Sequence, residues 1–152
     1  MMEASIREQT DRFTQKWQSI DRLYGEYAKA SGLTYMSLCV LEIIYNTPDN
    51  CTQKHICDES HYTKQNVNII IKSFLEQGYV KLQELPSDRR NKQVTLIEAG
   101  KTYAGNIIST LWEIEQEAIT SLTGEQRELL IQFAGIYEEC FRKRLAALLR
   151  DR

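Results

Sequence analysis

Two groups of polar side chains in the middle of the sequence have the residue types that hydrogen-bond to nucleic acids. The first group is the run Lys64, Gln65, Asn66 and Asn68. The second group lies in the stretch LPSDRRNKQVTLIEAGK (85–101) and consists of Asp88, Arg89 and Arg90. Asparagine and glutamine pair with two groups on the edge of adenine, while lysine and arginine suit guanine or phosphate. These residue types favour a double-stranded DNA partner.

A second kind of chemistry could come from four soft ligands. Cys51 and His55 lie four residues apart, as do Cys57 and His61, and cysteine and histidine at short spacing bind zinc in many proteins. However, Cys57 falls at a small position where two predicted helices pack, and His61 falls in the turn between them. Turning all four side chains inward would disrupt this pairing, so we expect no metal and no other cofactor.

Catalytic patterns are missing from the sequence. It contains no Ser-His-acid set, no Gly-rich phosphate loop, and no pair of carboxylates placed around a credible cleft. We therefore expect a protein that is not an enzyme.

Charge is distributed unevenly along the 152 residues, whose net charge is −2. Residues 60–93 contain six basic and three acidic side chains, a local charge of +3, so the remainder carries −5. This asymmetry is a hint of a nucleic-acid face on an acidic body. The N-terminal stretch MMEASIREQTDRF lacks the apolar region of an export signal, and no segment has membrane-spanning length. We expect a cytoplasmic protein without a membrane partner.

The four cysteines are expected to be reduced, because the sequence carries no export signal. They are Cys39, Cys51, Cys57 and Cys140. Cys51, in a predicted loop, is the best candidate for an exposed thiol, and we expect it to have no sensing role.

Helical periodicity predicts most of the elements that would position these residues. A stripe of apolar residues predicts a helix over 6–30, and Thr34 is placed to cap a second helix that stops before Asn46. Thr52 and Thr63 can each cap a further helix, the second of which ends at Gly78, a favoured residue just past a helix terminus.

The periodicity then changes to that of a β-hairpin. Val80 and Leu82 alternate with polar residues, as do Val94 and Leu96. A long helix follows beyond Gly100, and a capping box at 123–126 predicts a last helix. The order of elements predicts a mainly α-helical protein with a small β-hairpin wing, a winged helix-turn-helix.

The hairpin accounts for the arginine pair. Arg89 and Arg90 at an exposed tip are placed to enter a DNA minor groove, whose negative potential attracts arginine. Asp88 would be repelled by phosphate, so we expect its carboxylate to hold the Arg90 guanidinium in a bidentate pair. Lys81 and Lys92 are then placed for phosphates.

The segment from Gly32 to Lys101 resembles the MarR family of bacterial and archaeal transcriptional regulators, most closely in LEQGYVKLQELPSDRRNKQVTLIEAGK. The resemblance implies a single MarR-like domain over 1–152. Its DNA-binding lobe would span 34–97, and a helical dimerisation lobe would be formed by 1–31 and 98–152. It also implies a homodimer, and the apolar surface of the first and last helices independently permits one. The sequence departs from the family pattern at Ile97 and at Ile56–Cys57, and neither departure removes the resemblance.

The DNA contacts expected from residue types and from the resemblance include two helix caps and nine groove or backbone candidates. They are Thr52, Thr63, Lys64, Gln65, Asn66, Asn68, Lys72, Asp88, Arg89, Arg90 and Lys92.

Aromatic side chains raise the question of an effector. Many members of the family bind small aromatic molecules between their two lobes, and the aromatic candidates here are Trp17, Tyr24, Tyr27, Tyr35 and Trp112. Plain core and interface packing also explains each of them. The expected function is a ligand-responsive repressor that binds a pseudo-palindromic operator as a homodimer. A metal- or thiol-sensing regulator and a winged-helix protein-interaction module without specific DNA binding stay open as alternatives.

Overall fold

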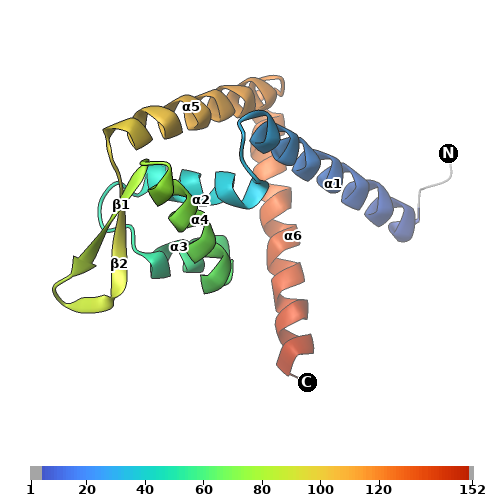
Figure 1. Cartoon of the computed structure of the whole chain (residues 1–152). Helices are drawn as coiled ribbons and strands as arrows, with labels where there is room; N and C mark the ends of the chain where they lie inside the picture. Colours follow the sequence, from blue (N-terminus) through green and yellow to red (C-terminus); the bar gives the residue numbers. More distant parts are fainter. Residues whose placement is uncertain (1–4, 151–152) are drawn as a thin grey trace. The chain divides into compact units, whose positions relative to one another are not determined.

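The computed structural model describes residues 5–150, and for Arg89 it describes the backbone only. The elements within this range are α1 (Ile6–Ala30), α2 (Tyr35–Asn46), α3 (Gln53–Ser60), α4 (Lys64–Glu76), β1 (Val80–Leu85), β2 (Asp88–Leu96), α5 (Glu98–Thr120) and α6 (Gly124–Arg150) (Figure 1). The predicted fold class, mainly α-helical with a two-stranded wing, is confirmed. The chain divides into two compact units, one up to Leu111 and one from Trp112, so the boundary lies within α5.

Side-chain caps begin the helices where the sequence predicts them. The side-chain oxygens of Thr34, Thr52 and Thr63 each accept a hydrogen bond from the backbone N–H three residues later. Such caps satisfy backbone donors that have no partner inside the helix. The capping box of α6 is also confirmed, because Thr123 and Gln126 exchange side-chain-to-backbone hydrogen bonds of 2.9 and 3.2 Å.

The first unit folds around one main apolar core that joins the helix-turn-helix to the wing. Buried side chains from α2, α3, α4, both strands and the start of α5 meet in it, among them Leu41, Ile44, Ile56, Val67, Phe74, Val94 and Ala104. A smaller cluster brings Ala28 of α1 against Leu38 and Ile108. The apolar periodicity of each helix therefore aims its side chains at a shared interior.

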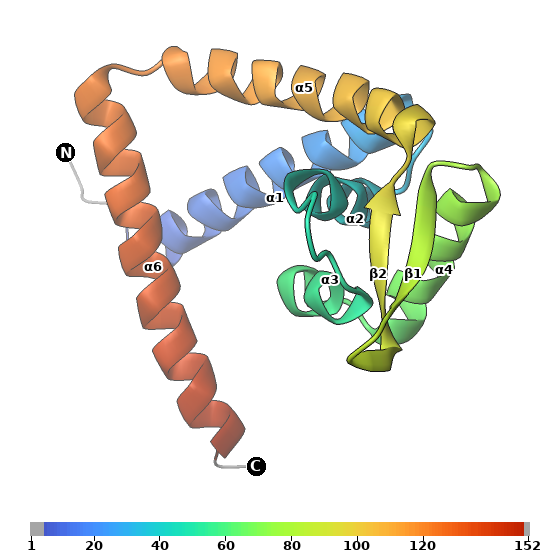
Figure 2. The same ribbon diagram turned by 90° about the vertical axis from the view of Figure 1, so that its left-hand side faces the viewer.

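The wing is an antiparallel hairpin that runs beside α4 (Figure 2). Val80 pairs with Leu96, and Leu82 pairs with Val94, so the alternating apolar residues of both strands lie on one face. That face covers the core. Burial of its apolar side chains sets the register of the two strands, because a slip of one residue would turn these side chains to the solvent.

Gly100 allows α5 to approach the start of the wing very closely. A Cβ atom built at this glycine would lie 1.8 Å from the carbonyl oxygen of Tyr79. The same carbonyl accepts a hydrogen bond from the N–H of Ile97 at 3.0 Å. The rings of Tyr79 and Tyr103 stack beside this contact, with centroids 4.0 Å apart and planes inclined by 7°.

Two long helices expose many large apolar side chains. On α1 they include Phe13, Trp17, Ile20 and Leu23, which are 44–62 % exposed. On α6 no residue is buried, and the exposed apolar residues include Leu130, Phe133, Ile136, Tyr137, Phe141 and Leu148. Across residues 5–150, no helix combines the length and apolar character needed to cross a bilayer.

Candidate nucleic-acid interface

The first half of α4 presents a polar surface to solvent. Thr63 caps the helix, and the side chains of Lys64, Gln65, Asn66 and Asn68 are all exposed, while Val67 between them is fully buried. The buried side is held against the core by Ile70, Ile71 and Phe74. The helix is therefore fixed on one side and free on the other to offer amide and ammonium groups, as a helix in a major groove must be.

One of these amides is oriented by the preceding helix. The side-chain Nε2 of Gln53, in the first turn of α3, donates to the Oδ1 of Asn68 at 3.1 Å. This bond occupies one lone pair of the Asn68 oxygen, so the amide NH₂ of Asn68 points to the other side of that oxygen. Gln53 is not among the residues predicted from the sequence, because no local pattern reveals a contact between side chains 15 residues apart.

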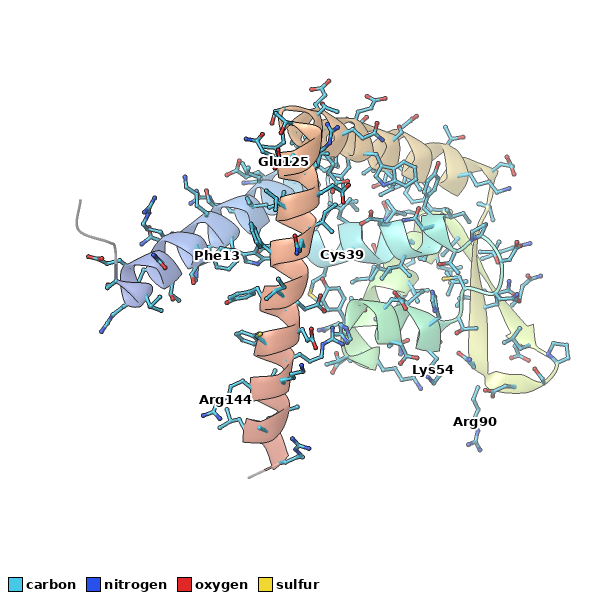
Figure 3. All side chains as sticks on the ribbon, turned by 180° about the vertical axis from the view of Figure 1, so that it is seen from behind. Phe13, Cys39, Lys54, Arg90, Glu125 and Arg144 are labelled. Atoms are coloured by element: carbon cyan, nitrogen blue, oxygen red, sulfur yellow. The ribbon has the colours of Figure 1, made fainter. Side chains whose placement is uncertain are left out.

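The tip of the wing places Arg90 away from the body of the hairpin (Figure 3). The expected bidentate pair between Asp88 and the Arg90 guanidinium is not found, and that prediction was wrong. Instead the Asp88 Oδ1 accepts a hydrogen bond from the backbone N–H of Arg90 at 3.1 Å. Aspartate commonly closes a turn in this way, by bonding to the backbone two residues on. The guanidinium is therefore left for an external partner, and the Arg89 side chain lies outside the described residues.

The base of the wing is attached to the start of α3. The N–H of Val94 donates to the carbonyl of Cys51 at 2.7 Å, and Thr52 forms a β-bridge with Gln93. Nearby, the Asn91 side-chain oxygen accepts from the N–H of Lys54 at 3.4 Å. Three pairs of residues, 94 with 51, 93 with 52 and 91 with 54, therefore join strand β2 to the start of α3.

The remaining candidates for DNA contacts differ in how free their side chains are. The Thr52 and Thr63 hydroxyls are occupied as caps by the N–H groups of His55 and Asn66. Lys72 is exposed and lies 3.8 Å from the Glu76 carboxylate, while Lys92 is half-buried. An exposed ion pair of this kind is weak and would be exchanged readily for a phosphate.

Cys51 is not the exposed thiol that its place in a loop suggested. Its side chain is fully buried in the main core, and burial raises the pKa of the thiol to about 11. The thiolate is the reactive form of cysteine, so burial lowers the reactivity of Cys51 at neutral pH. Cys140 is exposed on α6, and Cys39 and Cys57 are half-buried.

The two histidines near α3 have different surroundings. The Nε2 of His55 lies 3.3 Å from the Thr47 hydroxyl, and His61 ends α3 in the left-handed conformation with φ 57°. Among residues 5–150, no three His, Cys, Asp or Glu side chains are grouped in a way that would hold a metal ion.

The aromatic candidates for an effector site are only partly brought together. The rings of Tyr24 and Tyr35 lie 6.5 Å apart, and the Tyr27 hydroxyl donates to the Ile107 carbonyl at 2.6 Å. Partial burial, followed by the nearby Cys39 and Asp21, raises the pKa of Tyr35 to about 12. Trp17 is 62 % exposed on α1, and Trp112 belongs to the second unit.

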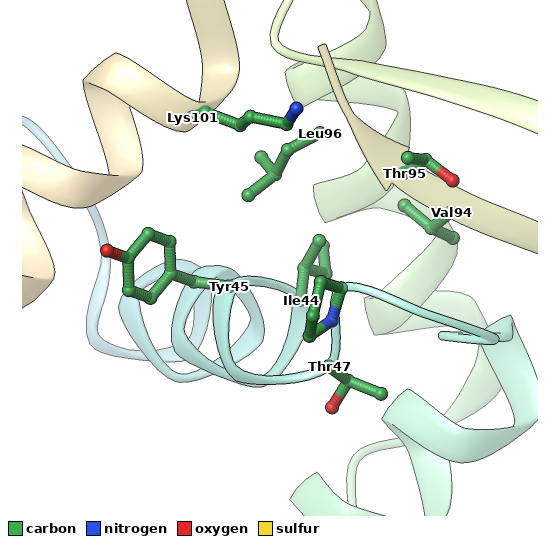
Figure 4. A pocket seen from close by; sticks show the side chains of 8 residues that line it. Ile44, Tyr45, Thr47, Val94, Thr95, Leu96 and Lys101 are labelled. Carbon is green, nitrogen blue, oxygen red and sulfur yellow. The ribbon is translucent and has the colours of Figure 1, made fainter. Parts of the chain in front are cut away.

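A pocket of about 300 Å³ lies elsewhere in the first unit, between the end of α2, β2 and the start of α5 (Figure 4). None of the five predicted aromatic residues lines it. Its lining residues are Ile44, Tyr45, Thr47, Pro48, Val94, Thr95, Leu96 and Lys101. The Lys101 ammonium is already 2.7 Å from the Glu98 carboxylate, so the pocket is mainly apolar.

Comparison with solved structures identifies relatives across most of the chain. A MarR family regulator from Neisseria meningitidis is 25 % identical, with 91 % of this chain and 96 % of that chain covered at a TM-score of 0.75. A MarR transcriptional regulator from Methanosarcina mazei is 21 % identical, with 88 % and 98 % covered at 0.70. MepR from Staphylococcus aureus, solved as a complex with DNA, is 18 % identical, with 86 % and 97 % covered at 0.71.

Comparison of the sequence finds a family model that matches part of the chain, and it finds no curated protein that matches. Residues 31–91, which contain α2, α3, α4 and the tip of the wing, match the model of the MarR family. This match and the shared fold of the regulators above support a MarR family winged-helix protein, with the family's own sequence pattern found over 31–91.

Proposed function

We propose that this regulator binds a pseudo-palindromic operator as a homodimer and represses transcription until a small aromatic effector releases it. The observation that carries the proposal is the exposed polar half of α4 beside a wing whose Arg90 guanidinium is unpaired by Asp88. Both belong to the first unit. One protomer therefore offers side chains for a major groove and for the neighbouring minor groove at the same time.

The MepR structure supports duplex DNA as the partner, because a protein with this fold was solved bound to DNA. In this chain the candidate contacts divide into two kinds. Gln65, Asn66 and Asn68 have the groups for base edges, while Lys64, Lys72 and Lys92 have the charge for phosphates.

The exposed apolar surfaces of α1 and α6 support the homodimer. A helix such as α6, with no buried residue among 27 and many exposed large apolar side chains, is not stable alone in water. Contiguous apolar surface of this extent marks an interface. In a two-fold dimer the two α4 helices would meet half-sites about one helical turn apart.

The effector is the least constrained part of the proposal. Tyr24, Tyr27 and Tyr35 offer aromatic surface close to the junction of α1 and α2. The pocket at the start of α5 is a second place for a small apolar molecule. Either would act by binding one dimer conformation more tightly than the other, which is the only way a ligand can shift that equilibrium.

Selection of DNA from a random library at two salt concentrations tests the proposal. An enriched inverted repeat with half-sites about ten base pairs apart is the expected result. A folded dimer that enriches no sequence would contradict it, and would favour a winged helix that contacts proteins instead.

Replacing Arg90 with alanine is expected to weaken operator binding about ten-fold while the protein remains folded. The wing would lose its minor-groove cation, and the slope of log affinity against log salt would fall by about one for each protomer. Arg90→Lys is the matched control, because it keeps the charge and should keep the slope. Titrations by fluorescence anisotropy at several salt concentrations measure both quantities. An unchanged affinity for Arg90→Ala would remove this residue from the interface.

Replacing Gln53 with alanine is expected to weaken operator binding about five-fold through an indirect effect, without a contact between Gln53 and DNA. The reason is that the Asn68 amide would lose the hydrogen bond that orients it, a change worth about 1 kcal/mol. A double-mutant cycle with Asn68→Ala checks this. If Gln53 acts through Asn68, adding Gln53→Ala to Asn68→Ala produces little further loss, whereas additive losses would assign Gln53 an independent role.

A further inference from the structure

The run Ile69-Ile70-Ile71 in α4 is divided between the core and the surface. Ile70 and Ile71 are 8 % and 1 % exposed, whereas Ile69 is 61 % exposed. A helix turns about 100° per residue and cannot bury three consecutive side chains on one side, so Ile69 is left at the surface.

Ile69 lies in the middle of the surface of α4 that faces away from the core. Gln65, Ile69, Lys72 and Glu76 follow one another at spacings of four, three and four, so they form one strip along the helix. All four are exposed, and the strip lies opposite the buried Val67, Ile71 and Phe74. Ile69 is therefore the apolar member of a strip that begins at a base-reading glutamine and continues to a lysine.

Stability does not explain an isoleucine at this position. Its side chain is outside the core, and a β-branched residue lowers helix propensity relative to Lys, Gln or Ala. A single exposed isoleucine is common on protein surfaces and by itself needs no explanation. Here, however, Ile69 lies on the surface that is proposed to enter a major groove. Side chains that enter the groove lose their contact with water.

The major groove offers a matching apolar group. Among the groups that the four base pairs present there, the C5-methyl of thymine is the only apolar one, and side-chain methyl groups pack against it. We propose that Ile69 is a specificity-determining residue that recognises a thymine methyl in each half-site. This inference rests on the proposed function. It predicts that an A·T pair in the half-site is read on both bases, with the adenine read by an amide of Gln65, Asn66 or Asn68.

The test uses the operator obtained by selection, with each thymine of the half-site replaced in turn by deoxyuridine. This replacement removes the methyl group and leaves the pairing groups unchanged. For the wild-type protein we expect one position at which uracil lowers affinity about four-fold, the effect of burying one methyl-sized group. The same replacement in both half-sites should lower affinity on the order of fifteen-fold.

Two variants isolate the contribution of Ile69. Ile69→Ala should bind the thymine operator about as weakly as the wild type binds the uracil operator, and it should no longer distinguish the two. Leu75→Ala is the matched control, because Leu75 is also exposed on α4, at 42 %, but lies in the last turn. It should keep the full preference for thymine. Thermal unfolding of each variant confirms that the helix still forms.

The outcomes separate this inference from the proposed function. If the wild type binds its operator but tolerates uracil at every position, or if Ile69→Ala keeps the thymine preference, the role of Ile69 is overturned and DNA binding stands. If no operator is enriched at all, the proposed function fails, and the role of Ile69 fails with it.

Discussion

Replacing Gly100 with alanine is expected to lower the free energy of unfolding by about 3 kcal/mol or more, at the upper end of what overpacking costs. The added Cβ would lie 1.8 Å from the Tyr79 carbonyl oxygen, and that backbone atom cannot move aside as a flexible side chain would. The first turn of α5 would have to shift away from the wing. The Ile97–Tyr79 hydrogen bond and the Tyr79–Tyr103 stack would be disturbed with it.

Gly105→Ala is the matched control for Gly100→Ala, because it lies in the same helix. A Cβ at Gly105 would meet only the Tyr45 ring and hydroxyl at 3.7–3.8 Å, an ordinary contact. Alanine is also favoured over glycine in a helix, so this variant should be unchanged or more stable by about 0.5–1 kcal/mol. Urea unfolding followed by circular dichroism measures both variants. Equal stability of the two would contradict the close approach at Gly100.

Replacing Phe133 with aspartate is expected to convert the proposed dimer into monomers and to lower operator affinity at least about 100-fold. Phe133 is 60 % exposed on α6, and in the proposed dimer its ring would be buried against apolar surface. An aspartate there would place an unpaired charge in the interface. Two linked half-sites bind far more tightly than one, typically by a factor of about 10² to 10⁴, and the monomer would lose this gain.

Gln132→Asp adds the same charge to the neighbouring residue of α6, on the polar side that also carries Glu128 and Glu139. This control should remain dimeric and keep its affinity. Analytical ultracentrifugation gives the oligomeric state, and anisotropy titrations give the affinity. A Phe133→Asp variant that is still dimeric and fully active would show that α6 does not form the interface around this residue.

Local signals in the sequence predicted the secondary structure well, because each has a nearby physical cause. Thr34, Thr52 and Thr63 begin helices because an extended threonine places its side-chain oxygen within reach of the N–H three residues later. The same reasoning could have found the capping box of α1, in which Ser5 and Glu8 are paired.

Contacts between distant segments could not be predicted in this way. Cys51 follows a turn and precedes a cap, which is typical of an exposed loop, yet its carbonyl accepts a hydrogen bond from the N–H of Val94 and its side chain is fully buried in the main core. Gln53 and Asn68 meet because two helices cross, and no periodicity encodes that meeting. The wrong prediction of an Asp88–Arg90 ion pair has a local cause instead. An aspartate in a turn has a backbone N–H two residues on, which lies closer to its carboxylate than a guanidinium does.

The attachment of β2 to the start of α3 has a consequence for the operator itself. Because Val94, Gln93 and Asn91 are bound to residues 51, 52 and 54, the wing cannot slide along DNA independently of the helix-turn-helix. In the proposed complex, the distance between the bases read by α4 and the minor groove entered by Arg90 would therefore be fixed by the protein. In the proposed complex, one base pair inserted between these two sites moves them apart by about 3.4 Å. We therefore expect a half-site of fixed length, in which the wing does not compensate for an inserted base pair.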